Sequence, residues 1–354
     1  MSASVTESRA RRPLRMSAPE VHDFAARDGV GLRLTRYRGG PKGPVILSPG
    51  FGTSGAAYTI DTVTTNLPEY LFAHGYDVWI FDYRASPALP SSATQFTLDD
   101  IADHDYPAAV QVVREVSRAD TVQVMAHCVG SLTFLLAMTR GLEGVRSAVS
   151  SALTLHPVAP LLNRAKARLR LASLLATTGL GTLTTDVASD RSLGVRAFDR
   201  MMRFYPSQDR CNSTFCRRVL FLYGEVYDHS KLNPATHETL HEVFGVANLT
   251  TFKQISTILN KGHAVSAAGQ EAYLPQADRL RIPIAFIHGE NNRLFLPKGS
   301  EDTFRLLCNV NGPEYYVRHV IRDYAHMDCF IGQDADRDVF PVVRAELDKH
   351  NPAG

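Results

Sequence analysis

A cysteine stands where a buried strand is expected to turn directly into a helix. The segment Ala126-His127-Cys128-Val129-Gly130-Ser131 follows an apolar run over 122–125 and precedes a helical pattern. A thiol on such a strand–turn–helix elbow lies at the N-terminus of the helix, whose dipole favours the nucleophilic thiolate. We therefore predict that Cys128 is a nucleophile, although a free cysteine is often only a small buried apolar residue.

Two later residues complete the order nucleophile, acid, base. Asn292 lies in the turn 288–293, where related Gly-x-x-Asp-Arg turns carry an acid, and His326 follows the next expected strand. A thiol is far more acidic than a hydroxyl, so a thiolate–imidazolium pair can form without a third negative charge. We expect His326 to be the base and Asn292 to orient it, with Glu290 as the alternative acid.

The glycine-rich segment 50–55 is expected to provide part of the oxyanion-binding site. An elbow nucleophile needs two N–H groups that stabilise the negative oxygen formed during acyl transfer. The backbone N–H groups of Phe51 and Val129 are the predicted pair, because glycines at 50 and 52 let the chain aim its N–H groups inward.

Two other motifs suggest different chemistry and are set aside. Residues 50–55 read G-x-G-x-x-G, but two expected strands precede them, whereas a dinucleotide-binding turn follows the first strand. His237 and His241 form H-E-x-x-H, yet Phe244 and Ala247 stand where the extended zinc motif needs Gly and His. No cofactor and no metal are expected.

Five cysteines and the absence of a secretory signal in the sequence indicate reduced thiols and a cytoplasmic protein. Cys211 and Cys216 form a close pair whose spacing fits no usual zinc or redox motif, so buried structural thiols are expected there.

The expected elements place the candidate residues at one edge of a sheet. An antiparallel lead-in at 21–37 is followed by strand–helix alternation, which predicts a mostly parallel central sheet with helices on both faces. The block 157–280 interrupts the alternation with an almost entirely helical pattern and no clear strand. We expect a disordered basic tail over 1–19, a core over 20–156 and 281–354, and an inserted helical cap over 157–280.

Charge and hydropathy exclude two classes of partner. The formal net charge is only +2, so nothing points to nucleic acid. No apolar run reaches the roughly 18–20 residues that span a bilayer, so no stable membrane insertion is expected.

The sequence resembles a known group of enzymes. The elbow at 126–131, the segments 81–84 and 97–100 and the ending 325–330 resemble the Cys-nucleophile α/β-hydrolase domain often fused to cholesterol-oxidase-like GMC oxidoreductases. Residues 77–136 are also similar to acid lipases and to Cys-elbow polyhydroxyalkanoate synthases. The resemblance implies an α/β-hydrolase fold and a lipid-like or sterol-like ester or thioester, and it implies that any oxidoreductase partner is a separate chain.

We therefore expect an esterase or thioesterase that forms an acyl-Cys128 intermediate from a hydrophobic small-molecule or carrier-bound acyl substrate. A thioester intermediate passes readily to acceptors other than water, so an acyltransferase or cyclase stays open. A non-catalytic protein that binds a lipid or a partner is the third alternative, because Asn292 replaces the acid.

Overall fold

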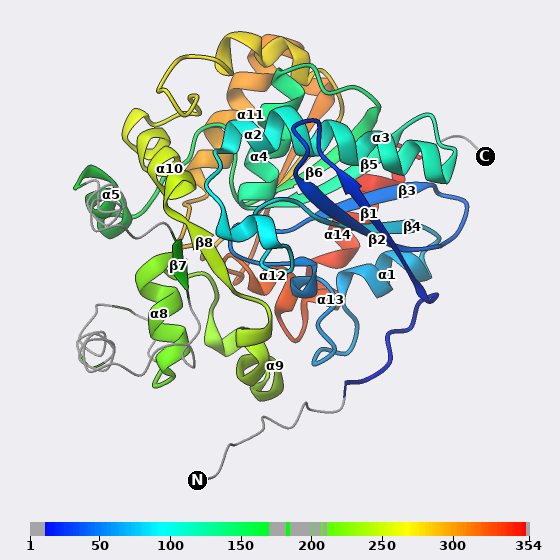
Figure 1. Ribbon diagram of the computed structural model, residues 1–354, viewed down its shortest axis with the longest axis horizontal. Helices are drawn as coiled ribbons and strands as arrows, with labels where there is room; N and C mark the ends of the chain where they lie inside the picture. The colour runs from blue at the N-terminus through cyan, green and yellow to red at the C-terminus, as the bar shows by residue number, and fades with distance from the viewer. Residues whose placement is uncertain (1–10, 170–181, 185–199, 201–206, 208–210, 352–354) are drawn as a thin grey trace.

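The computed structural model describes residues 11–169, 182–184, 200, 207 and 211–351. Its centre is an eight-stranded sheet in the order β1-β2-β4-β3-β5-β6-β9-β10, and only the two pairings of β2 are antiparallel (Figure 1). The strands are β1 (Pro19–Ala25), β2 (Gly31–Tyr37), β3 (Pro44–Ser48), β4 (Asp77–Asp82), β5 (Val122–His127), β6 (Val145–Ser151), β9 (Ile284–Gly289) and β10 (Tyr316–Ile321).

Helices cover both faces of this sheet and give the molecule three layers (Figure 1). One face packs against α3 (Tyr106–Ser117), α4 (Val129–Thr139) and α11 (Lys298–Asn311). The other packs against α1 (Leu67–Ala73) and α14 (Phe340–Asp348). The central strands β3, β4, β5 and β9 are buried on both faces, which explains why they read as continuous apolar runs rather than alternating ones. The predicted architecture is confirmed.

Parallel pairing decides where the candidate residues meet. β5, β6, β9 and β10 run side by side in one direction, so their carboxyl ends share one edge of the sheet. Cys128 follows β5 directly, Asn292 lies three residues after β9, and His326 lies five residues after β10. Ligands of such sheets bind at this edge.

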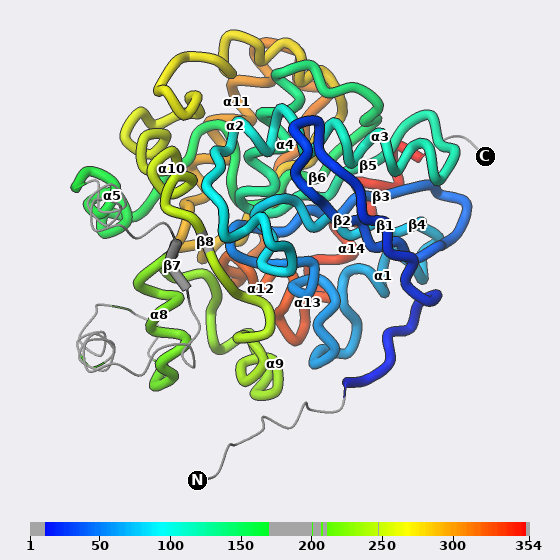
Figure 2. Tube along the Cα trace, in the orientation of Figure 1, coloured from blue at the N-terminus to red at the C-terminus, as the bar shows by residue number. Residues whose placement is uncertain are grey.

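The chain between β6 and β9 differs in part from the helical block that the sequence predicts. It contains α5 (Leu161–Arg168), α8 (Thr214–Leu222), α9 (Pro234–Thr239) and α10 (Leu249–Lys261), and α5 packs against α10 (Figures 1 and 2). It also contains β7 (Thr182–Thr184) and β8 (Val246–Asn248), which pair antiparallel. The expectation of no strand in this block was therefore wrong. Strands of only three residues are too short to show a periodic pattern in the sequence. The limits 157 and 280 of a cap subdomain stay a prediction.

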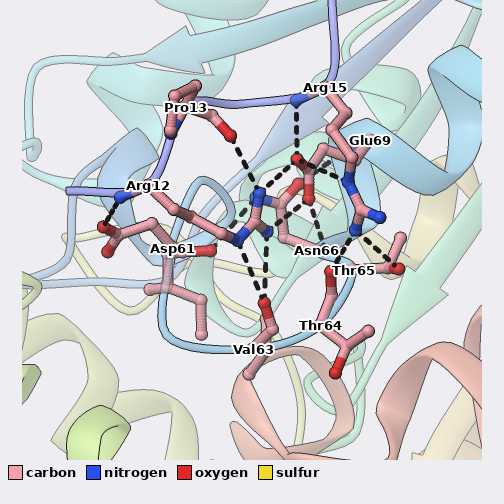
Figure 3. Close-up of polar contacts among 10 residues, drawn as sticks. Arg12, Pro13, Arg15, Asp61, Val63, Thr64, Thr65, Asn66 and Glu69 are labelled. Carbon is pink, nitrogen blue, oxygen red and sulfur yellow. Dashed lines mark hydrogen bonds and ion pairs between the residues drawn. The ribbon is translucent and has the colours of Figure 1, made fainter.

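The basic tail is ordered from residue 11 onward, which corrects the expectation of disorder up to residue 19. The Arg12 guanidinium donates to both carboxylate oxygens of Glu69 at 2.6 Å, and the backbone N–H of Arg15 donates to Glu69 at 2.8 Å (Figure 3). Glu69 is 2% exposed, so without these donors its buried charge would keep the backbone N–H of Asn66 but lose most of its other hydrogen-bond partners. Residues 1–10 of the expected tail lie outside the described residues.

Among the described residues, no helix is both long enough and apolar enough to cross a membrane.

Candidate active site

Cys128 lies on a strained turn between β5 and α4. Its backbone has φ 54° and ψ −125°, a conformation that costs a residue with a side chain of order 1–3 kcal/mol and is typical of functional sites. The turn also needs a small residue behind it: a Cβ at Gly130 would lie 2.4 Å from the carbonyl oxygen of Pro49. The elbow predicted from the sequence is thus present, with its glycine in the expected role.

A largely apolar pocket opens above Cys128. It holds about 1100 Å³ of empty space, some of it open to solvent, and Cys128, His326, Phe51 and Val129 all line it. Aromatic rings form part of the wall: the ring centroids of Phe51 and Phe252 lie 5.1 Å apart, and those of Tyr223 and Phe252 lie 5.6 Å apart. The other apolar lining residues are Ala159, Ala167, Phe221, Leu222, Val226, Phe244, Leu249, Ile255, Leu259, Leu294, Phe295 and Met327.

Two backbone N–H groups face the Cys128 sulfur. Hydrogen bonds from the N–H of Val129 and from the N–H of Phe51 both act on this thiol and lower its pKa. The approach of the Phe51 segment depends on Gly50, where a Cβ would lie 3.2 Å from that of Cys128. The structure therefore brings the two predicted oxyanion donors to one point beside the sulfur.

The charge state of the thiol differs from the expectation. Burial raises the pKa of Cys128 to about 12, and the two N–H groups offset only part of this effect. The position at the start of a helix was expected to favour a thiolate, but desolvation in an apolar pocket acts in the opposite direction. The resting residue is a neutral thiol.

His326 and Asn292 are in direct contact, with 3.0 Å between the Asn292 Nδ2 and the His326 Nδ1. The orientation of the amide follows from its other partners. The backbone N–H groups of Leu294 and Phe295 donate to the Asn292 Oδ1 at 3.0 and 3.1 Å. The amide nitrogen must then face His326, and since an amide NH₂ group only donates, the His326 Nδ1 accepts.

This contact fixes the tautomer of the imidazole. A neutral His326 that accepts at Nδ1 carries its proton on Nε2, whereas a base for the thiol needs Nε2 free. In Cys-His-Asn sites the asparagine orients a histidine that acts as base. The expectation that Asn292 plays this part holds for position only, because its amide nitrogen, not its oxygen, meets the ring.

Two further histidines, neither of them predicted as a site residue, lie near His326. The ring centroid of His127 lies 4.5 Å from that of His326, and the Nε2 of His288 hydrogen bonds to the carbonyl oxygen of Phe295 at 2.8 Å. Burial, and then the neighbouring imidazoles of His127 and His288, hold the pKa of His326 well below its ordinary value. An imidazolium is therefore disfavoured at His326.

Tyr223 is another lining residue that sequence reasoning missed. Its hydroxyl is buried, and no hydrogen-bond partner for it is found among the described residues. The hydroxyl lies against Gly52, where a Cβ would come within 1.9 Å of it. A buried O–H without a partner favours a bound group that accepts its hydrogen bond. No sequence signal identifies it, because Tyr223 follows α8 and lies far from the elbow in the sequence.

The remaining candidates lie elsewhere. Glu290 is exposed, and its carboxylate accepts from the backbone N–H of Asp323, so it does not serve as the alternative acid for His326. A dinucleotide-binding turn at 50–55 would also need an acid for the ribose, and Asp82 ends the next strand, but its carboxylate accepts from the N–H of Gly55 at 2.8 Å and from Ser86 at 2.5 Å. These contacts oppose Glu290 as the catalytic acid and Asp82 as a ribose ligand.

The H-E-x-x-H motif does not form a two-histidine grip. α9 ends at Thr239, so His241 lies in a following 3₁₀ turn and its Nδ1 contacts the carbonyl oxygen of Glu238 at 2.9 Å. His237 instead turns toward Cys211 and Cys216. The two histidines therefore do not share one helix face.

The comparisons with known proteins agree with this fold. Human lipase member K is 22% identical over 368 aligned residues, which cover 91% of this chain and 85% of the relative. Among solved structures, a monoglyceride lipase from Saccharomyces cerevisiae in complex with a substrate analogue superimposes with a TM-score of 0.61 at 16% identity, covering 97% of this chain and 98% of the other. The esterase Pf2001 of Pyrococcus furiosus gives a TM-score of 0.55 at 13% identity, covering 95% and 94%.

A protein-family model also matches most of the sequence. The model described as alpha/beta hydrolase fold matches residues 43–333, which include the elbow, Asn292 and His326. The chain belongs to the α/β-hydrolase family.

Proposed function

We propose that this protein cleaves ester or thioester bonds of hydrophobic acyl substrates through a covalent acyl-Cys128 intermediate. One observation carries the proposal. Cys128 sits on a strained elbow at the base of an apolar pocket, with two backbone N–H groups at its sulfur and His326 in the same lining. Relatives described as lipases and esterases support action on lipid-like esters.

The pocket indicates the part of the substrate that is bound. Aliphatic and aromatic side chains dominate its lining, and the cluster of Phe51, Tyr223, Phe244 and Phe252 lies close to the elbow. Such a wall binds an acyl chain or a fused apolar ring by excluding water, at roughly 25 cal/mol per Å² of apolar surface buried. We expect affinity to rise with the apolar surface of the acyl group.

The first half of the reaction forms a thioester. The Cys128 sulfur bonds to the carbonyl carbon, and the electron pair of the C=O bond moves to the oxygen between the N–H groups of Phe51 and Val129. The bond to the leaving group then breaks, and the thiol proton passes to the departing alcohol or thiol by way of the His326 Nε2. In the second half a nucleophile attacks the thioester carbon, the C–S bond breaks, and the proton of the nucleophile returns to Cys128.

Asn292 sets the speed of both proton transfers. The His326 Nε2 becomes free only when the ring proton moves to Nδ1, and that step breaks the hydrogen bond from Asn292. Water is the acceptor most dependent on a base, so hydrolysis of acyl-Cys128 is the step most slowed. This observation favours acyl transfer to an amine or thiol as a second candidate function for the same intermediate.

A series of p-nitrophenyl esters of increasing chain length tests the proposal. We expect p-nitrophenol release by the wild type, with a KM that falls as the chain lengthens, and no release above background by Cys128→Ala. Cys308→Ser is the matched control, because Cys308 lies in α11 and is not among the pocket-lining residues. Equal release by Cys128→Ala and wild type would overturn the proposal, and binding without release in both would indicate a lipid-binding protein.

Adding an acceptor separates hydrolysis from transfer. If acyl-Cys128 persists, hydroxylamine or a short-chain thiol raises the steady-state rate of p-nitrophenol release and appears in the product as its acyl derivative. If water is the natural acceptor, the rate and the free acid product stay unchanged.

A further inference from the structure

Four potential metal ligands gather in the segment between β6 and β9. The Sγ atoms of Cys211 and Cys216 and a ring nitrogen from each of His229 and His237 all lie within 4.8 Å of one another. Cys211 precedes α8 and Cys216 lies in its first turn, while His229 begins a 3₁₀ turn over 229–231 and His237 lies in α9. Three separate elements thus contribute to one cluster, and two of them, α8 and α9, lie in the lower left part of Figure 1.

The spacing of the ligand atoms matches a tetrahedral ion. Zinc binds sulfur at about 2.3 Å and imidazole nitrogen at about 2.0–2.1 Å, so at a tetrahedral angle S and N lie about 3.5 Å apart. The His237 Nε2 lies 3.4 Å from the Cys211 Sγ and 3.2 Å from the Cys216 Sγ. The imidazoles of His229 and His237 adjoin, with ring centroids 5.0 Å apart.

We propose that Cys211, Cys216, His229 and His237 bind one Zn²⁺ ion in a structural site. Four protein ligands fill a tetrahedral coordination sphere, which is typical of structural rather than catalytic zinc. Two thiolates neutralise the ion, and the two histidines bind as neutral imidazoles. Binding therefore transfers two thiol protons to solvent and involves no oxidation or reduction.

The same cluster is not explained as well by a disulfide or by packing. Both cysteines are free in the structure, and two histidines turned toward their sulfurs have no role in a disulfide. Cys216 is 6% exposed, and its sulfur lies among polar groups rather than in a purely apolar environment. The polar side chains around this sulfur are those of His229, Tyr227, Ser213 and His237, and the His237 Nε2 lies 3.2 Å from it.

The position of the cluster indicates what the ion would stabilise. α8 begins at the cluster, and Phe221, Leu222 and Tyr223 at its other end line the pocket above Cys128. The chain then passes Val226, whose carbonyl oxygen accepts from the backbone N–H of Met327 at 2.8 Å, next to His326. Zinc would therefore fix one wall of the acyl pocket without touching the reacting atoms.

Metal content of variants tests the site directly. Protein produced with added zinc and passed through gel filtration is expected to hold one equivalent of zinc by elemental analysis. Cys216→Ser and His237→Ala are expected to lose it. Two controls are matched to them: Cys308→Ser removes a cysteine outside the cluster, and His241→Ala removes the other histidine of the H-E-x-x-H motif. Both controls are expected to retain the ion.

Cobalt substitution of the wild type identifies the ligands without relying on the folding of a variant. Co²⁺ in this site is expected to give intense visible absorption of tetrahedral cobalt together with thiolate-to-metal charge transfer, and zinc is expected to displace both. Chelation is expected to lower Tm, and added zinc to restore it.

Three results would overturn the proposal. The first is wild-type protein without zinc and without a cobalt spectrum. The second is loss of metal in His241→Ala but not in His237→Ala, which would assign the ion to the helical motif. The third is an intact mass lower by two hydrogens that reductant restores only when both Cys211 and Cys216 are present, which would assign a disulfide. None of these results depends on acyl transfer, so the two proposals fail separately.

Discussion

Replacing Asn292 by aspartate is expected to accelerate the reaction. In Asn292→Asp one carboxylate oxygen still accepts hydrogen bonds from the backbone N–H groups of Leu294 and Phe295. The other oxygen can accept a hydrogen bond from His326 when Nδ1 carries the proton. The favoured tautomer then leaves Nε2 free to take the Cys128 proton. The carboxylate also opposes the burial that now depresses the pKa of His326.

The size of the effect follows from the hydrogen bond that the wild type must break. Loss of the bond from Asn292 to His326 costs ~1–3 kcal/mol, because it leaves a buried donor without a partner. At about 1.36 kcal/mol for each factor of ten, removing this cost raises the acylation rate roughly 5- to 150-fold. The opposite change in a serine triad lowers kcat by about 10⁴, which is an upper bound because a thiol needs less help from a base.

Single-turnover release of p-nitrophenol at neutral pH measures this rate. Asn291→Asp is the matched control, since it adds the same charge one residue away at an exposed position. An acylation rate that stays within twofold of wild type in a folded Asn292→Asp protein would refute the tautomer argument. Equal acceleration by Asn291→Asp would show that charge alone, and not the contact with His326, is responsible.

Three other predictions concern separate parts of the molecule. Because burial raises the pKa of Cys128 to about 12, its alkylation rate should keep rising with pH beyond neutrality, and a plateau below pH 8 would instead show a thiolate–imidazolium pair. Tyr223→Phe should lower kcat/KM about 5- to 10-fold if the hydroxyl donates to bound substrate, with an unchanged Tm, and an unchanged kcat/KM would remove it from the site. Arg12→Ala should lower the free energy of unfolding at pH 7, since bonds from Arg12 and neighbouring N–H groups outweigh burial and lower the pKa of Glu69 from 4.5 to about 2. That stabilisation is present above the unfolded pKa and is lost as pH falls through the folded one, so the wild type and Arg12→Ala should converge in chemical denaturation between pH 5 and pH 2, and a constant difference would oppose the assignment.

The part of the site that the sequence predicts depends on chain direction. Cys128, Asn292 and His326 each follow a strand, and the carboxyl ends of parallel strands lie at one edge of the sheet. Their positions after these strands were therefore enough to predict that they lie at the same edge. The amide orientation of Asn292 was not predictable, because it depends on backbone N–H groups that face it only after the turn has folded. The depressed acidity of the thiol has the same origin, since it depends on how completely the pocket excludes water.

The elements that were predicted correctly have long patterns in the sequence. The features that were missed depend on contacts between residues far apart in the sequence. The buried strands and the antiparallel lead-in appear as apolar runs and turn residues, and they form as expected. The ordered tail at Arg12 depends on a carboxylate 57 positions away. The four proposed zinc ligands join two cysteines to His229 and His237, which come from two later segments of the chain. Local spacing could not show this grouping, and it pointed instead to His241.

Trapping the intermediate tests the central claim most directly. The wild type is mixed with a long-chain acyl thioester, quenched in acid within the first turnover, and examined by intact mass and peptide mapping. We predict a mass increase equal to one acyl group on the peptide that contains Cys128, absent from Cys128→Ala and retained in Cys308→Ser. Turnover without this adduct, or an acyl group carried on any other residue, would contradict the account.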